Sequence, residues 1–224
     1  MIEIVAATRL PENSFWKESP LGISLIRLSF DERLKNYIAF SNQRGLPEIY
    51  NSRIRSSESP DMLIFIHDDV WIDDFFLADH VIQGLKEFDI IGVAGNKRLV
   101  PNQPSWAFVD DKFTWDSKNN LSGAVAHGPL PFGPVSHYGK VPADCELLDG
   151  VLLAACKPKL NESAAYFDTS FDFHFYDLDF CRTARSKGLR MGTWHITITH
   201  KSGGSFGSPA WIAKRDAYRI KWKA

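Results

Sequence analysis

Three polar residues, His67, Asp68 and Asp69, directly follow residues 62–66, the most apolar short run of the chain. In open α/β sheets, ligands bind outside the carboxyl ends of the strands. Two adjacent carboxylates repel each other unless a positive charge lies between them, and carboxylates together with imidazole suit Mn²⁺ or Mg²⁺. The alternative is a polar strand end whose acids cap the next helix. The pattern therefore favours either a divalent-cation site or a helix cap at this strand end.

A second acidic pair, Asp177 and Asp179, stands at the start of a predicted helix, directly after the aromatic run 171–175 and Tyr176. Residues two apart on a helix point in different directions, so we expect the two acids to have different roles. A carboxylate among apolar side chains has a raised pKa, which suits a general base. The alternative is structural, because acids at a helix N-terminus interact favourably with the helix dipole.

A third candidate is His200, which ends a predicted strand and precedes Lys201 and the glycine-containing stretch 202–207. A histidine in this place can ligate the metal of a bound anion, glycines let the backbone approach phosphate, and Lys201 or Lys214 can neutralise charge. Turns of this composition are common, so the pattern is weak by itself. The sequence contains no nucleophile elbow, no nucleotide-binding P-loop and no His-Glu-x-x-His motif.

These residues need strands and helices to position them, and the first part of the chain supplies an alternating pattern. Short apolar runs predict buried strands at residues 2–7, 62–66 and 89–95. Helical spacing of apolar residues separates these runs, at residues 24–41, 46–51 and 74–88. Uninterrupted apolar strands are buried on both faces, which is typical of parallel sheets covered by helices. The sequence therefore predicts an α/β fold with a mostly parallel central sheet flanked by helices.

Residues 96–141 differ from the preceding segment because they are rich in Pro, Gly, Asn and Ser. Trp106, Trp115, His127 and His137 are scattered among them. Long irregular segments inside a domain are usually functional. We interpret this one as an excursion that faces the substrate and includes a small hairpin; a disordered surface insert is the alternative.

Regular structure returns in the C-terminal part. Residues 145–155 predict a strand, residues 171–187 an aromatic approach and a helix with Gly188 as its C-cap, and residues 191–200 a β-branched strand. The tail, residues 209–223, predicts a helix that bears tryptophan and basic residues. Such a helix either lies against an anionic membrane surface or packs its aromatic side chains on the domain.

Composition narrows the class of protein. The chain has 224 residues, which predicts one domain, and its 26 Lys and Arg against 27 Asp and Glu argue against a dedicated nucleic-acid binder. The three cysteines lack the number and spacing of a disulfide framework, which favours a reducing compartment. Because neither a signal peptide nor a membrane-spanning run is evident, we expect a cytoplasmic location.

The motifs follow one another in order: a strand and His-Asp-Asp, then Leu-Asp-Gly-Val-Leu-Leu-Ala, then Phe-His-Phe-Tyr-Asp-Leu-Asp-Phe, then a histidine before Ser-Gly-Gly. This ordered set resembles the family 2-like glycosyltransferases of the streptomycin-biosynthesis StrF type, which have the Rossmann-like GT-A fold. The resemblance extends over residues 2–206 and includes residues 45–51, which look like that family's helix beside the nucleotide. It implies that Thr8, which ends the first strand, and Asn51 lie near the nucleoside.

The activity that the resemblance implies is transfer of a sugar from a nucleotide-diphosphate donor, most often a uridine one. The acceptor would be a hydroxyl of a glycan, a lipid-linked or a small-molecule compound, and the cofactor Mn²⁺ or Mg²⁺. His67, Asp68 and Asp69 would take the place of the family's Asp-x-Asp signature, with Asp69 as metal ligand and His67 as a departure at the first acid. His200 is similar to the C-terminal metal ligand, and Lys201 would help to stabilise the diphosphate.

The same resemblance places Asp177 where such enzymes keep the catalytic base, although Tyr176 replaces the usual glutamate, and Asp179 is the alternative base. Asp149 would face the donor sugar or the acceptor. The mechanism that it implies is a single inverting displacement, in which the base removes a proton from the acceptor hydroxyl.

We expect a single glycosyltransferase domain over the whole chain. Its regions would be a nucleotide-binding half, an acceptor-side insertion, an acceptor and catalytic half, and a basic aromatic C-terminal helix, at residues 1–95, 96–141, 142–207 and 208–224. Two rival functions stay open. One is a metal-dependent nucleotide-sugar hydrolase whose ligands are His67, Asp69 and His200; the other is a carbohydrate-binding module without catalysis, which the tryptophan-rich segment would suit.

Overall fold

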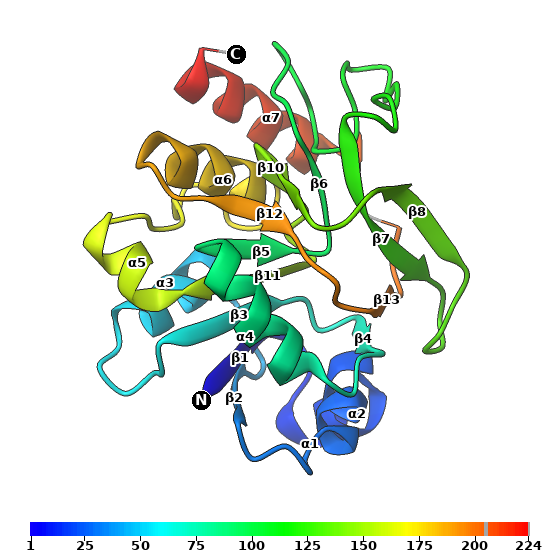
Figure 1. Cartoon of the computed structure of the whole chain (residues 1–224), viewed down its shortest axis with the longest axis vertical. Helices are drawn as coiled ribbons and strands as arrows, with labels where there is room; N and C mark the ends of the chain where they lie inside the picture. The colour runs from blue at the N-terminus through cyan, green and yellow to red at the C-terminus, as the bar shows by residue number, and fades with distance from the viewer. Residues whose placement is uncertain (204–205, 224) are drawn as a thin grey trace.

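A seven-stranded mixed sheet forms the centre of the molecule in the computed structural model, which describes residues 1–203 and 206–223 (Figure 1). In spatial order its strands are β2 (Leu34–Ala39), β1 (Ile2–Ala7), β3 (Met62–Ile66), β11 (Leu152–Cys156), β5 (Ile90–Gly92), β12 (Met191–Thr193) and β9 (Ala143–Asp144). β1 is parallel to β2 and β3, and β5 is parallel to β12, whereas β11 runs antiparallel to its neighbours β3 and β5. The predicted α/β class with a mostly parallel central sheet is confirmed.

A second sheet, of six strands, has no counterpart in the prediction. Its strands are β10 (Leu147–Leu148), β6 (Ala94–Asn96), β7 (Leu121–His127), β13 (Ile198–His200) and β4 (Val70–Ile72), with β8 (Val135–Gly139) paired to β7. β7 and β8 form the small antiparallel hairpin that we expect within residues 96–141.

Three apolar runs that predict single strands are each divided between the two sheets. Residues 89–95 form β5 and β6, residues 191–200 form β12 and β13, and residues 145–155 form β10 and β11. At the first break, the carbonyl of Val93 accepts a hydrogen bond from the N–H of Ala124 in β7, at 3.2 Å. Both sheets bury these strands, so each run stays apolar across the point where it passes from one sheet to the other. The apolar pattern therefore does not reveal where the strand is interrupted.

Residues 24–41 form only in part the helix that their spacing predicts. Helix α2 (Pro20–Arg27) ends early, and the rest of the segment contributes β2, the edge strand beside β1. The apolar residues Leu34, Ile38 and Phe40 all occupy even-numbered positions, so they fit one face of a strand as well as the turns of a helix. Because these residues pair in parallel with β1, they form a strand and not a helix.

Helices flank the two sheets (Figure 1). Besides α2, the described residues form α1 (Glu12–Glu18), α3 (Leu46–Arg55), α4 (Leu77–Glu87), α5 (Lys157–Glu162), α6 (Tyr176–Ser186) and α7 (Pro209–Trp222). Gly188 has a φ of 81° just after the end of α6, the left-handed conformation expected of a C-terminal glycine. None of the helices in the described part of the chain is long and apolar enough to cross a membrane.

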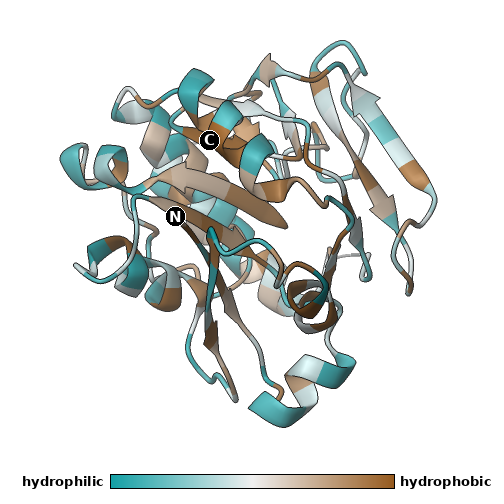
Figure 2. Cartoon of the chain, turned by 60° about the horizontal axis from the view of Figure 1, so that its bottom comes forward, coloured by the Kyte–Doolittle hydropathy of each residue, from teal (hydrophilic) through white to brown (hydrophobic). Residues whose placement is uncertain are grey.

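The core lies on the central sheet, whose middle strands are apolar along their length (Figure 2). Ile4 pairs with Ile64, Ile64 with Ala154, and Ala154 with Ile91, and all four residues are fully buried. Truncating one such isoleucine to alanine typically costs about 2–5 kcal/mol of stability. This packing fixes the strand ends at which the polar residues of the candidate site begin.

Candidate active site

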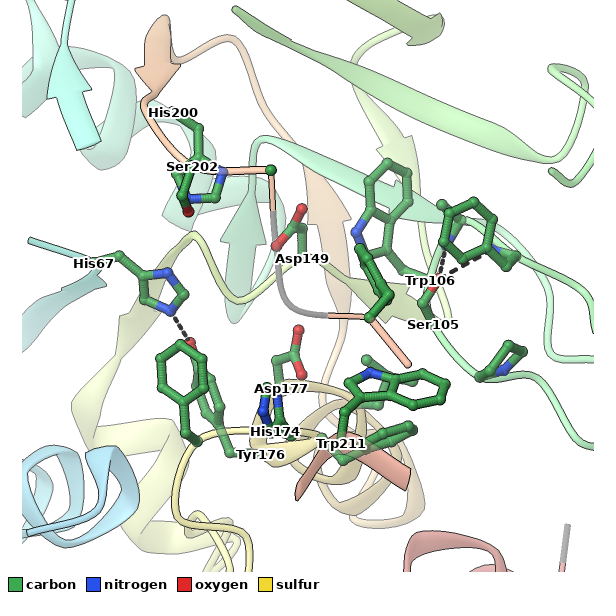
Figure 3. Close-up of a pocket in the computed structure, with 18 of the residues that line it drawn as sticks. His67, Ser105, Trp106, Asp149, His174, Tyr176, Asp177, His200, Ser202 and Trp211 are labelled. Carbon is green, nitrogen blue, oxygen red and sulfur yellow. Dashed lines mark hydrogen bonds between the residues drawn. The ribbon is translucent and has the colours of Figure 1, made fainter. Parts of the chain in front are cut away.

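A cavity of about 510 Å³ opens at the carboxyl end of β3 and is lined by residues of both sheets. His67, Asp69 and His200 line one end of it. Figure 3 shows His67 and His200 on one side, the carboxylates of Asp149 and Asp177 in the middle, and tryptophans on the other side. The cavity therefore has three chemically different parts.

Strand pairing brings the first part together. Asp69 lies in the short link between β3 and β4, and His200 ends β13, opposite Val70 of β4. The N–H of Lys201 donates to the carbonyl of Asp69 at 3.0 Å, and Nε2 of His200 lies 3.3 Å from Oδ1 of Asp69. Two segments far apart in the sequence thus present one imidazole and one carboxylate to the same point.

His67 completes this group. One donor atom from each of His67, Asp69 and His200 can be chosen so that all three lie within 4.8 Å of one another. Two imidazoles and a carboxylate form a donor set that suits Mn²⁺ and other first-row metals better than Mg²⁺, which prefers oxygen ligands. The residues present therefore fit a divalent cation, and His67 belongs with the other two.

The electrostatics of Asp69 and His200 are coupled. Burial alone would raise the pKa of Asp69, but the hydrogen bond with His200 and its charge hold that pKa well below the usual range. Burial alone would lower the pKa of His200, but the hydrogen bond with Asp69 and its negative charge raise it above the usual value. For His67 burial dominates and lowers the pKa, so its imidazole stays neutral, as a ligand must be.

Asp177 and Asp149 form the second part. Asp177 lies in the first turn of α6, and its Oδ2 accepts a hydrogen bond from the N–H of Gly150 at 3.0 Å. Burial, followed by the negative charge of Asp149, raises the pKa of Asp177 to about 7. Asp149 lies in the turn between β10 and β11, where its Oδ1 accepts from the N–H of Val151. A carboxyl with a pKa near 7 can accept a proton at neutral pH.

The third part is aromatic. Trp106 and Trp115 come from the segment that the sequence interprets as substrate-facing, and both line the cavity. Tyr138 stacks on Trp115 with ring centres 5.8 Å apart, and Phe206 and Trp211 complete this end. The sequence does not identify these last three as site residues. Their only signal is aromatic composition, because the hairpin, the turn before α7 and α7 itself, which carry them, reach the cavity through long-range packing.

Two residues expected at the site lie elsewhere. The amide nitrogen of Asn51 donates to the carbonyl of Phe167 at 2.7 Å, and the amide oxygen accepts from the N–H of Phe167 at 3.0 Å. Asp179 is fully buried and accepts from the indole N–H of Trp222 at 2.7 Å and from Nζ of Lys221 at 2.7 Å. Asn51 thus ties α3 to the segment before α6, and Asp179 anchors α7. Neither residue lines a described cavity, and this placement favours Asp177 over Asp179 as the candidate base.

A second cavity, of about 570 Å³, adjoins the first, since Asp68 lines both. Thr8, at the end of β1, lies in its wall, and its Oγ1 accepts from the N–H of Leu10 at 3.1 Å. Arg9 and Arg44 also line it. Thr8 and Asp68 are therefore together, whereas Asn51 is absent from this wall.

Fixed positive charge is scarce near the cation ligands. Among the described lining residues of the first cavity there is no lysine or arginine. Lys201 contributes its backbone N–H to Asp69, and its side chain is exposed. Nζ of Lys214 pairs with Asp172 at 3.0 Å and donates to the carbonyl of Ser170 at 2.6 Å. The predicted role of Lys201 in neutralising a diphosphate therefore has no contact to support it.

No family model matches the chain, and no curated protein matches it in sequence. Solved structures do match. GalNAc-T7 with UDP, GalNAc and Mn²⁺ has 10% identity and a TM-score of 0.54, over 98% of this chain and 48% of that one. The mannosyltransferase PcManGT from Pyrobaculum calidifontis, with GDP-Man and Mn²⁺, has 13% identity and a TM-score of 0.51, over 98% and 64%. TarS from S. aureus has 12% identity and a TM-score of 0.50, over 98% and 39%.

These likenesses concern the fold, because the identities are low. The fold is that of the GT-A glycosyltransferases, as expected. The chain spans about half of the GalNAc-T7 chain and 64% of the mannosyltransferase chain.

Proposed function

We propose that this protein is a metal-dependent glycosyltransferase that uses a nucleotide-diphosphate sugar and inverts the anomeric centre. One observation carries the proposal: a cation-ligand group and a carboxyl with a pKa of about 7 share one cavity of a GT-A fold. Its kinship with the StrF-type enzymes in particular is part of the proposal and rests on the order of the sequence motifs.

The donor nucleotide is assigned to the second cavity. Thr8 and Asp68 line it, and Arg9 and Arg44 supply the positive charge that a diphosphate needs. The cation ligands His67, Asp69 and His200 lie next to it, in the cavity that shares Asp68. A bound Mn²⁺ or Mg²⁺ would neutralise the charge of the departing diphosphate. A uridine nucleotide is the first candidate.

Asp177 is assigned as the general base. The N–H of Gly150 holds its Oδ2, so Oδ1 is left to accept the proton of an acceptor hydroxyl. Its pKa of about 7 lies near the operating pH, where a base accepts a proton without being permanently protonated. Asp177 does not belong to the cation-ligand group, and this separation of base from leaving-group site suits a single displacement. Asp149 is assigned to bind hydroxyls of the donor sugar, which would lie between the base and the leaving-group site.

The acceptor is assigned to the aromatic end of the cavity. Trp115 is 54% exposed although it stacks on Tyr138, so its ring can contact the apolar face of a sugar. Because the described lining offers carboxylates and no lysine or arginine, we propose an uncharged acceptor, such as a glycan without phosphate or carboxylate groups.

The proposal includes no membrane surface. Trp211 and Tyr218 of α7 are buried against the domain, and the basic residues Arg215 and Arg219 pair with Asp111. These contacts favour the alternative in which the helix packs on the domain.

Calorimetry of UDP and GDP binding, with and without Mn²⁺, tests the proposal. We expect binding of one nucleotide that requires the metal and weakens in Asp69→Ala. If neither nucleotide binds with Mn²⁺ or Mg²⁺, the transferase assignment is wrong and a carbohydrate-binding module becomes the better interpretation. If a nucleotide sugar is consumed at the same rate with and without acceptors, the protein is a hydrolase instead.

A further inference from the structure

Tyr176 connects the candidate cation ligand His67 to the loop that holds Asp149. Its hydroxyl oxygen lies 2.8 Å from Nε2 of His67 and 2.8 Å from the carbonyl oxygen of Gly150 (Figure 3). A carbonyl oxygen can only accept, so the single hydroxyl proton of Tyr176 must point at Gly150. If it pointed at His67 instead, two oxygens would face each other at hydrogen-bond distance with no proton between them.

This assignment determines the tautomer of His67. With its proton committed to Gly150, the hydroxyl of Tyr176 accepts a hydrogen bond, and Nε2 of His67 must be the donor. In the neutral ring the proton then sits on Nε2, and Nδ1 keeps its lone pair. Figure 3 shows the ring edge that carries Nδ1 turned toward the side of His200.

Tyr176 is well placed for this task because its side chain is tightly packed. Its side chain is 3% exposed, and its ring packs against Tyr50 and Phe167, with ring centres 6.0 Å away in each case. A Cβ on Gly150 would lie 2.5 Å from the Tyr176 hydroxyl and 2.7 Å from Cβ of Asp177. Only glycine therefore lets the loop approach α6 closely enough to accept the hydrogen bond.

Gly150 also contacts the candidate base. Its N–H donates to Oδ2 of Asp177 at 3.0 Å. Its carbonyl accepts a hydrogen bond from the hydroxyl of Tyr176, the residue directly before Asp177. One glycine residue thus holds the orientation of His67, through Tyr176, and that of Asp177 directly. The cation-ligand group and the base are joined by a continuous chain of hydrogen bonds.

We propose that Tyr176 is a positioning residue that fixes His67 in the Nε2–H tautomer, so that Nδ1 is the ligand atom, and that Gly150 couples this ligand to the orientation of Asp177. The inference rests on the proposed function in one respect, that His67 binds a cation. Partners that orient a ligating histidine typically contribute 10- to 100-fold to metal affinity. Tyr176 does not touch the substrate in this assignment.

The tautomer can be measured in the wild-type protein without metal or nucleotide. Long-range ¹H–¹⁵N correlation spectra, recorded above the range in which the ring titrates, distinguish the two nitrogens of His67. We expect a protonated Nε2 and an unprotonated Nδ1. In Tyr176→Phe, which removes only the hydroxyl, we expect a mixture of tautomers. A wild-type ring with its proton on Nδ1 overturns the proposal, whether or not the variant folds.

Binding of Mn²⁺ alone gives the second readout. We expect Tyr176→Phe to weaken Mn²⁺ binding by about 10- to 100-fold. Phe167→Leu is the matched control, because the Phe167 ring packs against Tyr176 with ring centres 6.0 Å apart and carries no hydrogen-bonding group. It should leave Mn²⁺ binding and the tautomer unchanged. If both variants weaken binding equally, repacking of the cluster explains the loss and the proposal fails.

The two proposals can fail separately. If the Nε2–H tautomer is found and Mn²⁺ binding depends on Tyr176, the positioning role stands even when no nucleotide binds. If a nucleotide binds with Mn²⁺ and Tyr176→Phe leaves both tautomer and metal affinity intact, the transferase assignment stands and the positioning role is wrong.

Discussion

Asp69 and His200 are held together by the main chain as well as by their side chains. Nε2 of His200 lies 3.3 Å from Oδ1 of Asp69, and the next residue, Lys201, donates its N–H to the carbonyl of Asp69 at 3.0 Å. The antiparallel pairing of β13 with β4 would keep the two backbones in register without either side chain. Each side chain can therefore be replaced to test its chemistry while the other stays in place.

Asp69→Asn should weaken Mn²⁺ binding by at least about 10-fold, because it replaces a charged oxygen ligand with a neutral one. Isothermal titration with Mn²⁺ measures this effect. Asp68→Asn is the matched control, since Asp68 is the adjacent acid, lies outside the cation-ligand group, and should leave binding of the metal alone unchanged. Equal losses in the two variants would contradict the assignment of Asp69 as ligand.

Asp177→Asn should lower the transfer rate by about 100- to 10,000-fold, the usual contribution of a general base, and leave nucleotide affinity nearly intact. Turnover with a nucleotide sugar and calorimetry of the nucleotide measure the two quantities. Asp179→Asn is the comparison variant, because it changes the other acid of the pair. It should destabilise the fold, because it weakens the contacts with Lys221 and Trp222, but retain turnover. Substantial turnover in Asp177→Asn would exclude this residue as base.

The raised pKa of Asp177 predicts a pH effect on stability. Its pKa rises from 3.8 to about 7 on folding, so between these pH values the folded state keeps a proton that the unfolded chain has released. Stability of the wild type therefore falls as pH rises through this window and levels off above it. The difference in unfolding free energy between Asp177→Asn and wild type should grow from about pH 5 to about pH 8. Denaturant titrations at both pH values measure it, and a constant difference would be inconsistent with the raised pKa.

Asn51→Ala should destabilise the protein by about 1–3 kcal/mol, because it leaves the buried N–H and carbonyl of Phe167 without their partner. Urea denaturation measures the loss. Nucleotide affinity should not change, since Asn51 is 3% exposed and lines neither cavity. A clear drop in nucleotide affinity in the folded variant would restore Asn51 to the donor site.

Trp115→Ala should raise the KM for an uncharged glycan acceptor by about 5-fold, which corresponds to about 1 kcal/mol of stacking. The KM for the donor should stay unchanged, because Trp115 is not a cation ligand and does not line the second cavity. Steady-state kinetics with both substrates varied separate the two effects, and an equal change in both values would contradict the acceptor assignment.

Short-range patterns predict much of the fold and part of the site. The apolar runs of β1 and β3, the helix α3 and the C-terminal glycine of α6 agree with the sequence, because local spacing and capping decide them. The split of residues 89–95 was not predictable, since an apolar strand looks the same in either sheet. Asp179 is two positions from Asp177 on α6, so its side chain points away from that of Asp177, as the helical spacing predicts.

The contact between His67 and Tyr176 shows why the rest of the site is not predictable. Both residues depart from the pattern that the sequence resembles, one at the acidic signature and one before the base. Nothing in the local sequence of either relates it to the other. Their hydrogen bond depends on the pairing of β11 with β3, which brings Gly150 and α6 beside the carboxyl end of β3.

The order of strands in the central sheet has a consequence for folding. β11, from the second half of the chain, lies between β3 and β5 of the first half, and β12 pairs with β5 on its other side. Residues 1–95 expressed alone would leave the edges of β3 and β5 exposed, and residues 142–207 alone would keep the pairing of β12 with β9 but lose the strands on both sides of β11. We therefore expect all-or-none unfolding and slow, long-range folding, so that residues 1–95 and 142–207 cannot be separated into fragments that fold independently.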